Sequence, residues 1–234
     1  MKNATRKLIP ALAMLLISAV LMSTASFAWF SMNKTVTATG MTVTAKADQT
    51  FLVISSTANN PGTAVSATAS NAAAELFPAA YGGIAAGTVT WKTGYSNNIN
   101  SSVNVGELTD VHTNDVNKYV LSNTFYIRAA SGTVNATNLK LTGVTVTGTS
   151  IFKDAVSVVV AVGDEVNQFN KTQFTDNNNL SNATPLAATV TSNADVIVNV
   201  YIYIDGNHQN VKTINAIDAA NLTGMSVELV FGVA

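Results

Sequence analysis

The chain contains no cysteine, only four prolines and two histidines, and few charged residues. Without cysteine it cannot form disulfide bonds, thiolate metal sites or a cysteine nucleophile, so its fold depends on packing alone. Charged residues make up 11% of the 234 residues, and the formal net charge is -1. Such a weak field does not attract a polyanion, which argues against binding to nucleic acid.

The two histidines do not form a catalytic or metal-binding motif. Neither His112 nor His208 lies in a spacing such as HExxH, whereas a zinc hydrolase needs three ligands and a general base. No serine lies in a G-x-S-x-G elbow. We therefore expect no enzyme activity, catalytic residue, cofactor or metal, and interpret both histidines as loop residues. The oxygen-rich segments 163–165 and 176–179 are alternatives as calcium loops, although ordinary turns also explain them.

Thr, Val, Ala, Asn, Ser and Gly dominate the chain after residue 28, a composition typical of two-faced strands joined by turns. Alternation of apolar and polar residues predicts strands, and it is most regular at 196–204. The run 155–162 is almost continuously apolar, which indicates a central strand covered on both faces. The other expected strands are 35–45, 49–55, 89–91, 119–129, 138–147 and 225–233.

The alternation changes phase at Gly40 and again at Gly143, and we expect a β-bulge to absorb the extra residue. Residues 56–117 read as a loop-rich excursion with a turn of helix at 71–76, docked by bulky side chains. A short helix is expected at 213–222, ended by glycine. Together these features predict a single all-β domain over residues 29–234, an antiparallel jelly-roll-like sandwich. The docking side chains are Leu76, Phe77, Tyr81 and Trp91.

The N-terminus has the layout of a secretory signal peptide. Basic residues precede an uncharged apolar stretch, Leu8 to Met22, and small residues follow it. We expect a hydrophobic signal helix over residues 1–28, cleaved between Ala28 and Trp29, with Ser23-Thr24-Ala25 as a competing site and a retained membrane anchor as the alternative. The mature protein is then secreted, either extracellular or on the cell surface.

The segment Ala28-Trp29-Phe30-Ser31, followed by the strand at 35–45, resembles the TasA/camelysin group of Firmicutes surface proteins with a SipW-type signal peptide. Segments 120–128 and 200–206 are similar to later strands of proteins with the same leader. The resemblance implies an exported jelly-roll-like sandwich, and biofilm fibres in the case of TasA. Met32 stands where that family has aspartate. Camelysin has been described as a metalloprotease, but no metal motif carries over, so that activity is not transferred.

Our hypothesis for function is a structural protein of the extracellular matrix that forms homo-oligomers or fibres by β-strand addition. The donor would lie within Trp29–Ala47. The alternative for this segment is pairing within its own sandwich. The alternative for the protein is a monomeric adhesin or glycan-binding module that uses residues 56–117. The candidate donor residues are Val36, Ala38, Met41 and Val43. Aromatic residues that fit either a sugar platform or sheet packing are Trp29, Phe30, Trp91, Tyr201 and Tyr203.

Overall fold

The structure is a computed structural model that describes residues 36–38, 41–47, 52–59, 64, 66–70, 74–85, 87–93, 108–130, 135–175, 177–208, 211 and 225–233. Strands dominate these residues, which confirms the all-β prediction. No helix in the described ranges is long and apolar enough to cross a membrane. In chain order the elements are β1 (Val36–Ala38), β2 (Thr42–Ala47), β3 (Leu52–Ser55), β4 (Ser66–Ser70), β5 (Ala74–Leu76), β6 (Ala80–Ala85), β7 (Thr88–Thr93), β8 (Thr109–Asp110), η1 (Thr113–Lys118), β9 (Val120–Ala129), β10 (Ala136–Thr147), η2 (Ile151–Ala155), β11 (Val156–Val162), β12 (Glu165–Phe169), α2 (Lys171–Thr175), α3 (Asn177–Ser181), β13 (Ala187–Val190), β14 (Val196–Ile204) and β15 (Ser226–Gly232).

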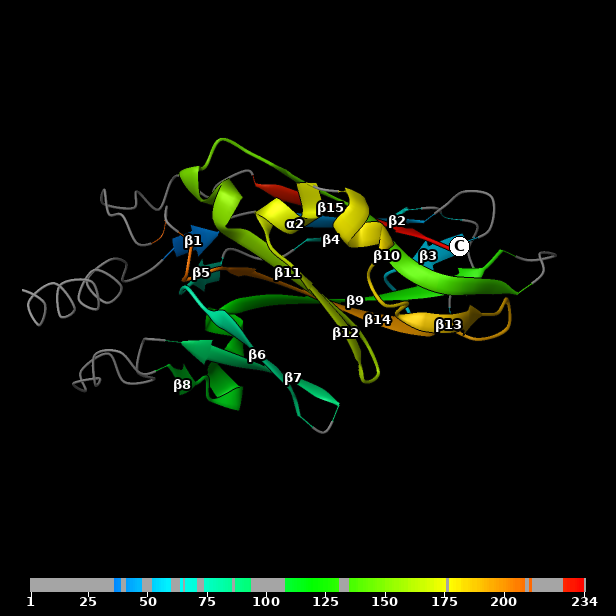
Figure 1. The fold of residues 1–234 in the computed structure, drawn as a ribbon, viewed down its shortest axis with the longest axis horizontal. Helices are drawn as coiled ribbons and strands as arrows, with labels where there is room; N and C mark the ends of the chain where they lie inside the picture. The colour runs from blue at the N-terminus through cyan, green and yellow to red at the C-terminus, as the bar shows by residue number, and fades with distance from the viewer. Residues whose placement is uncertain are drawn as a thin grey trace, which may run out of the picture.

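Two five-stranded sheets form the sandwich, and a small sheet adds a third layer (Figure 1). The first sheet has the order β13-β10-β15-β2-β4, and the central sheet has the order β12-β11-β14-β9-β3. The small sheet, β6-β7-β8, lies on the face of the central sheet that points away from the first sheet. The central sheet is therefore covered on both faces where β11 and the end of β14 lie against the small sheet.

The main core lies between the first and central sheets because each strand turns its alternate apolar residues inward. In β14, Val198, Val200 and Ile202 are fully buried. The predicted central strand is confirmed as β11, which lies between β12 and β14 and is buried on both faces. Val158 and Val160 enter the main core, whereas Val159 points toward the small sheet. A strand buried on both sides has no polar face, which explains its unbroken apolar sequence.

One strand pair departs from the antiparallel expectation. β2 and β15 run parallel, with Val43 opposite Val227 and Ala45 opposite Leu229. The other named strand pairs of the described residues are antiparallel. Parallel neighbours need a long connection, and nearly the whole domain lies between these two strands.

The predicted loop-rich excursion contains more regular structure than its sequence indicated. It includes β4 to β8 and η1. The helical turn predicted at 71–76 is wrong where the structure describes it, since Ala74–Leu76 is β5, paired with β1. A single helical turn is costly to nucleate, whereas β5 forms backbone hydrogen bonds with the neighbouring strand β1. The docking role predicted for Leu76 and Trp91 is confirmed, because both are buried.

The predicted β-bulge at Gly143 is confirmed by a register shift between Leu141 and Gly143 in the pairing of β10 with β15. A Cβ at Gly143 would lie 3.3 Å from Val230 Cβ, so the bulge also has little room for a side chain. The bulge predicted at Gly40 and the helix predicted at 213–222 lie outside the described residues.

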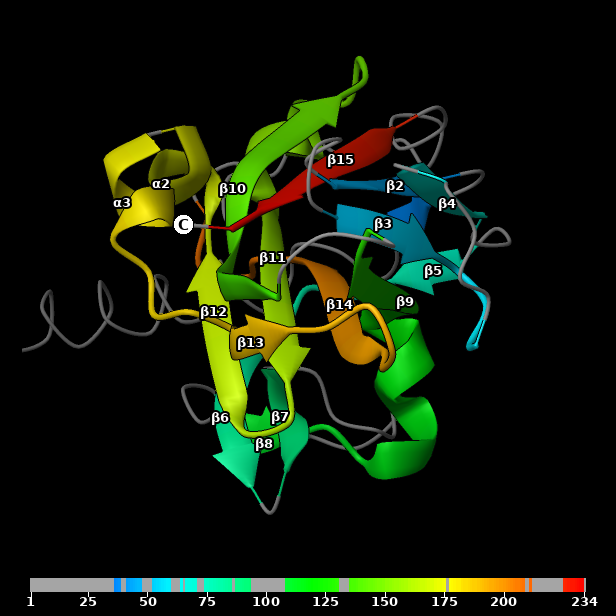
Figure 2. The same cartoon turned by 90° about the vertical axis from the view of Figure 1, so that its right-hand side faces the viewer.

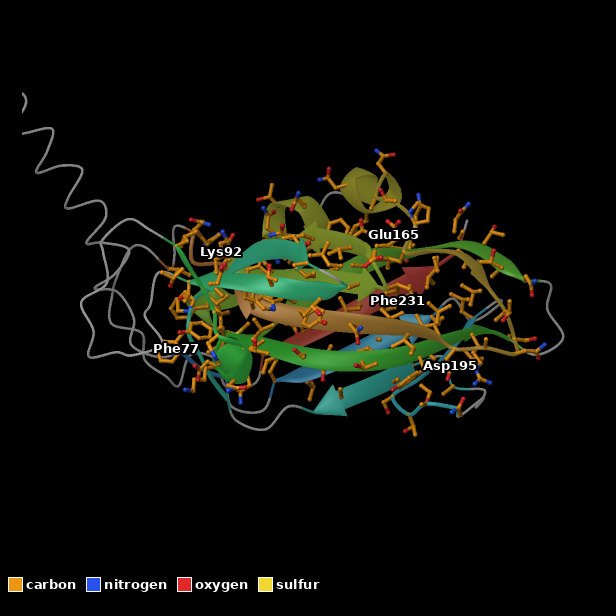
Figure 3. All side chains as sticks on the ribbon, turned by 90° about the horizontal axis from the view of Figure 1, so that it is seen from below. Phe77, Lys92, Glu165, Asp195 and Phe231 are labelled. Atoms are coloured by element: carbon orange, nitrogen blue, oxygen red, sulfur yellow. The ribbon has the colours of Figure 1, made fainter. Side chains whose placement is uncertain are left out.

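A partly buried ion pair fixes one end of the central sheet. Asp195, just before β14, accepts a hydrogen bond from Arg128 Nε on β9 and another, 2.9 Å long, from the backbone N–H of Asn59. The Arg128 guanidinium is the main cause that lowers the pKa of Asp195. In Figure 3, Asp195 lies at the opposite end of the molecule from Phe77. The pair therefore ties the turns after β3 and before β14 to β9.

Candidate functional site

The candidate site is β2 together with the position it occupies in the first sheet. Its sequence alternates strictly, so Val43, Ala45 and Ala47 face the core while Thr42 and Thr44 face outward. Met41, just before the strand, is fully buried, as are Val43 and Ala45. Burial of each larger side chain stabilises the fold by about 1.5–3 kcal/mol, so the sandwich needs a strand at this position.

The two neighbours of β2 come from distant parts of the chain. β15 pairs with β2 in parallel on one side, and β4 pairs in antiparallel on the other. Figure 2 shows β10, β15, β2 and β4 side by side, with β4 at the edge. We call the position between β15 and β4 the β2 slot. The fully buried side chains of β15 beside it are Val227, Leu229 and Phe231.

The polar contacts that the structure describes on the outward face of the β2 slot are weak. Thr44 Oγ1 on β2 lies 3.4 Å from Thr68 Oγ1 on β4. Lys46 Nζ lies 2.8 Å from Glu228 Oε2, and the two side chains are 46% and 40% exposed. An ion pair this exposed contributes about 0–1 kcal/mol. Backbone pairing and apolar burial therefore hold β2 in place.

The predicted donor residues fall into two groups. Met41 and Val43 lie in the β2 slot of their own chain, which is the pairing in cis that we kept as the alternative. Val36 and Ala38 belong to β1, opposite Leu76 and Ala74 of β5 in a separate two-stranded sheet. The predicted cleavage residues Ala28 and Trp29 lie outside the described residues.

A short connection joins β2 in the first sheet to β3 in the central sheet. Residues 48–51 separate β2 in the first sheet from β3 in the central sheet. Four residues reach at most about 14 Å, little more than the roughly 10 Å between packed sheets. β2 can therefore enter another copy only where the β2 slot of that copy lies within about this reach of β3.

The aromatic residues belong to a second core rather than to an open platform. Trp91 of β7 is 2% exposed, and its ring centroid lies 5.0 Å from that of Tyr203 and 5.8 Å from that of Tyr201. Tyr203 OH accepts a hydrogen bond of 2.7 Å from Gln168 Nε2, and burial is the main cause that raises its pKa to about 12. This arrangement confirms sheet packing for these three residues. Trp29 and Phe30 lie outside the described residues.

The histidines and the acidic turns have local structural roles. His112 is the N-cap of η1, and its Nδ1 accepts a hydrogen bond of 3.3 Å from Asn114 N. His208 donates its backbone N–H to Asp205 O in the turn after β14. Residues 163–165 form the tight connection from β11 to β12. In the described part of the chain, no three His, Asp or Glu side chains are grouped as metal ligands do.

Sequence reasoning identified β2 and its neighbour β15 but missed β4 and the pairing of the three strands, since no local pattern links Ser226–Gly232 or Ser66–Ser70 to Thr42–Ala47. Comparison with known proteins does not narrow the assignment further. No family model matches the chain, and neither a curated protein nor a solved structure matches it significantly.

Proposed function

We propose that this chain is a secreted structural protein of the cell surface or extracellular matrix, without enzymatic activity, whose copies assemble into fibres by exchange of the N-terminal strand. In this mechanism β2 of one copy fills the β2 slot of the next. The signal-like N-terminus and the resemblance to TasA support the location and the fibre. Signal peptidase would act on the precursor, and only the precursor signal would contact the membrane.

The observation that carries the proposal is the complete burial of Met41, Val43 and Ala45 between two strands that are distant in sequence. The same contacts form whether β2 comes from the same chain or from another copy. Strand exchange therefore loses little contact energy. The chain concentration and the connection at 48–51 then decide whether β2 pairs within its own chain or with another copy. Short connections favour exchange over folding back.

Because the chain lacks cysteine, paired single-cysteine variants test the exchange directly. Thr44→Cys and Thr68→Cys chains, one with a mass tag, are refolded together at high concentration and oxidised. The hydroxyl oxygens of these residues lie 3.4 Å apart, so a disulfide fits with small adjustment. We expect tagged–untagged heterodimers on a non-reducing gel.

The matched control is the pair Thr147→Cys and Ser226→Cys on β10 and β15. Their hydroxyl oxygens lie 2.6 Å apart, but neither strand leaves the body in the proposed exchange. This pair should give no heterodimer. If Thr44→Cys and Thr68→Cys also give none, while the double variant cross-links within single chains, β2 pairs only in cis and the fibre proposal fails. Fibres that persist in negative-stain images after deletion of residues 29–39 would show that assembly does not need the segment before β2.

A further inference from the structure

The free edges of the sheets differ in how well they resist pairing with another strand. Proteins protect an edge with charge, bulges, short strands or covering segments. On β3, Ile54 N already donates to Ala64 O, 2.9 Å away. On β12, Glu165 supplies a charge. On β6, the register shifts before Gly83, whose φ is 110°. β8 has two residues, including Asp110.

Among the described residues, the edge strand β4 has no charge, bulge or covering segment. Its sequence, Ser66-Ala67-Thr68-Ala69-Ser70, contains no charge and no proline, and its five residues pair with β2 without a register shift. Among the described strands, β4 ends the first sheet, so its outer backbone groups have no strand partner there. A regular, uncharged edge is a template for another strand.

We propose that β4 pairs with β4 of a second copy of this chain, antiparallel across a two-fold axis at Thr68. The sequence of β4 reads the same in both directions, so this register places each residue opposite a small, uncharged one. Thr68 faces its own copy, Ser66 lies opposite Ser70, and Ala67 lies opposite Ala69. Threonine and serine pairs stabilise neighbouring strands, and no like charges meet.

The faces of β4 suit this arrangement. Ser66 and Thr68 are exposed, while Ala67 is 8% exposed and Ala69 packs at the margin of the main core. Pairing would join the two first sheets into one continuous sheet and extend the main core across the axis. This contact does not depend on exchange of β2, because it uses the opposite edge of β4.

The other uncharged edge of the first sheet, β13, is less suited. It has four residues, and Pro185 lies two residues before it. Both of its ends are already tied, since Leu186 N donates to Leu139 O at 2.7 Å and Thr191 O accepts from Ala129 N at 3.0 Å. This strand supplies the comparison for the experiment.

The test uses single-cysteine variants of the whole chain and analytical ultracentrifugation. Oxidised Thr68→Cys should form covalent homodimers, because opposed residues in paired strands have Cβ atoms about 4.5–5.5 Å apart. Thr145→Cys, on the part of β10 that pairs with β15 but not with β13, should stay monomeric, as should Thr189→Cys on β13. In the experiment on β2 exchange, the Thr68 homodimer and the Thr44–Thr68 heterodimer are separate products. The pairing of β4 with β4 and the exchange of β2 can therefore be refuted independently.

A charge placed on β4 gives a second readout. Thr68→Lys and Ser66→Lys should each weaken dimerisation about fivefold or more, whereas Thr145→Lys should leave it unchanged. Both β4 positions are exposed, so the variants should keep the wild-type melting curve. The proposal is overturned if the wild-type chain sediments as a monomer at roughly millimolar concentration, if Thr189→Cys cross-links instead, or if Thr68→Cys yields no more dimer than Thr145→Cys.

Discussion

The hydroxyl group of Tyr203 lies deep in the core between the central and small sheets, where the side chain is 1% exposed. Burial raises its pKa from 10.0 to about 12. The folded chain therefore holds this proton more tightly than the unfolded chain does. The resulting stability is fully present below about pH 10 and is lost as the pH rises through about 12, by roughly 2–3 kcal/mol.

Tyr203→Phe should therefore flatten the alkaline loss of stability, measured as the free energy of unfolding in urea between pH 9 and 12. Part of the loss should remain, because burial also raises the pKa of Tyr119 and Tyr201. An unchanged profile in Tyr203→Phe would contradict the role assigned to this hydroxyl.

For other single residues, the sequence pattern predicted the position but not the surroundings. The aromatic side chains Trp91, Tyr201 and Tyr203 fitted two interpretations, because alternation places a residue on a face but does not say what covers that face. Only the small sheet, folded over β11 and β14, makes this face a core. His112 was correctly placed in a loop, yet its capping of η1 depends on a helix that no periodicity predicted.

At the scale of elements, two glycines with positive φ in the turns after β10 and β11 differ in how much room they leave for a side chain. Gly148 follows β10 with φ 137°, and a Cβ there would lie 2.8 Å from Met225 Cγ. Gly163, between β11 and β12, has φ 58° and open space around it. Alanine at Gly163 should cost about 1–2 kcal/mol from strain, whereas alanine at Gly148 should cost about 1–3 kcal/mol more, because Met225 is fully buried. Equal free energies of unfolding in urea for the two variants would refute this distinction.

The strands themselves were largely predictable. Alternation located β9, β10, β14 and β15 to within a few residues, and the phase change at Gly143 located a bulge. The wrong prediction was the helical turn that is β5, because an alanine-rich stretch favours helix only when no strand lies beside it. The short helices α2 and α3 were missed, since five residues hold too few turns to show a period.

At the scale of the molecule, two cores share the central sheet, so we expect them to unfold together. Phe231→Ala creates a cavity in the main core, and Trp91→Ala creates one in the second core. Each should destabilise the whole chain by about 3–5 kcal/mol. Near-ultraviolet circular dichroism and hydrogen exchange of the β6–β8 amides, followed through the same denaturant series, should report one transition. A Trp91→Ala chain whose small sheet loses protection while the sandwich stays folded would contradict the shared core.

The sequence by itself determined the strands with a regular apolar pattern, which of their residues point inward, and that β11 is covered on both faces. These properties depend on neighbours along the chain, and a two-residue period reports them directly. Only the tertiary structure decided which strands pair, including the parallel contact of β2 with β15, the edge position of β4 and the third layer formed by β6 to β8. Pairing depends on contacts between segments distant in sequence, and many alternating strands of similar composition fit one another equally well until packing selects a register.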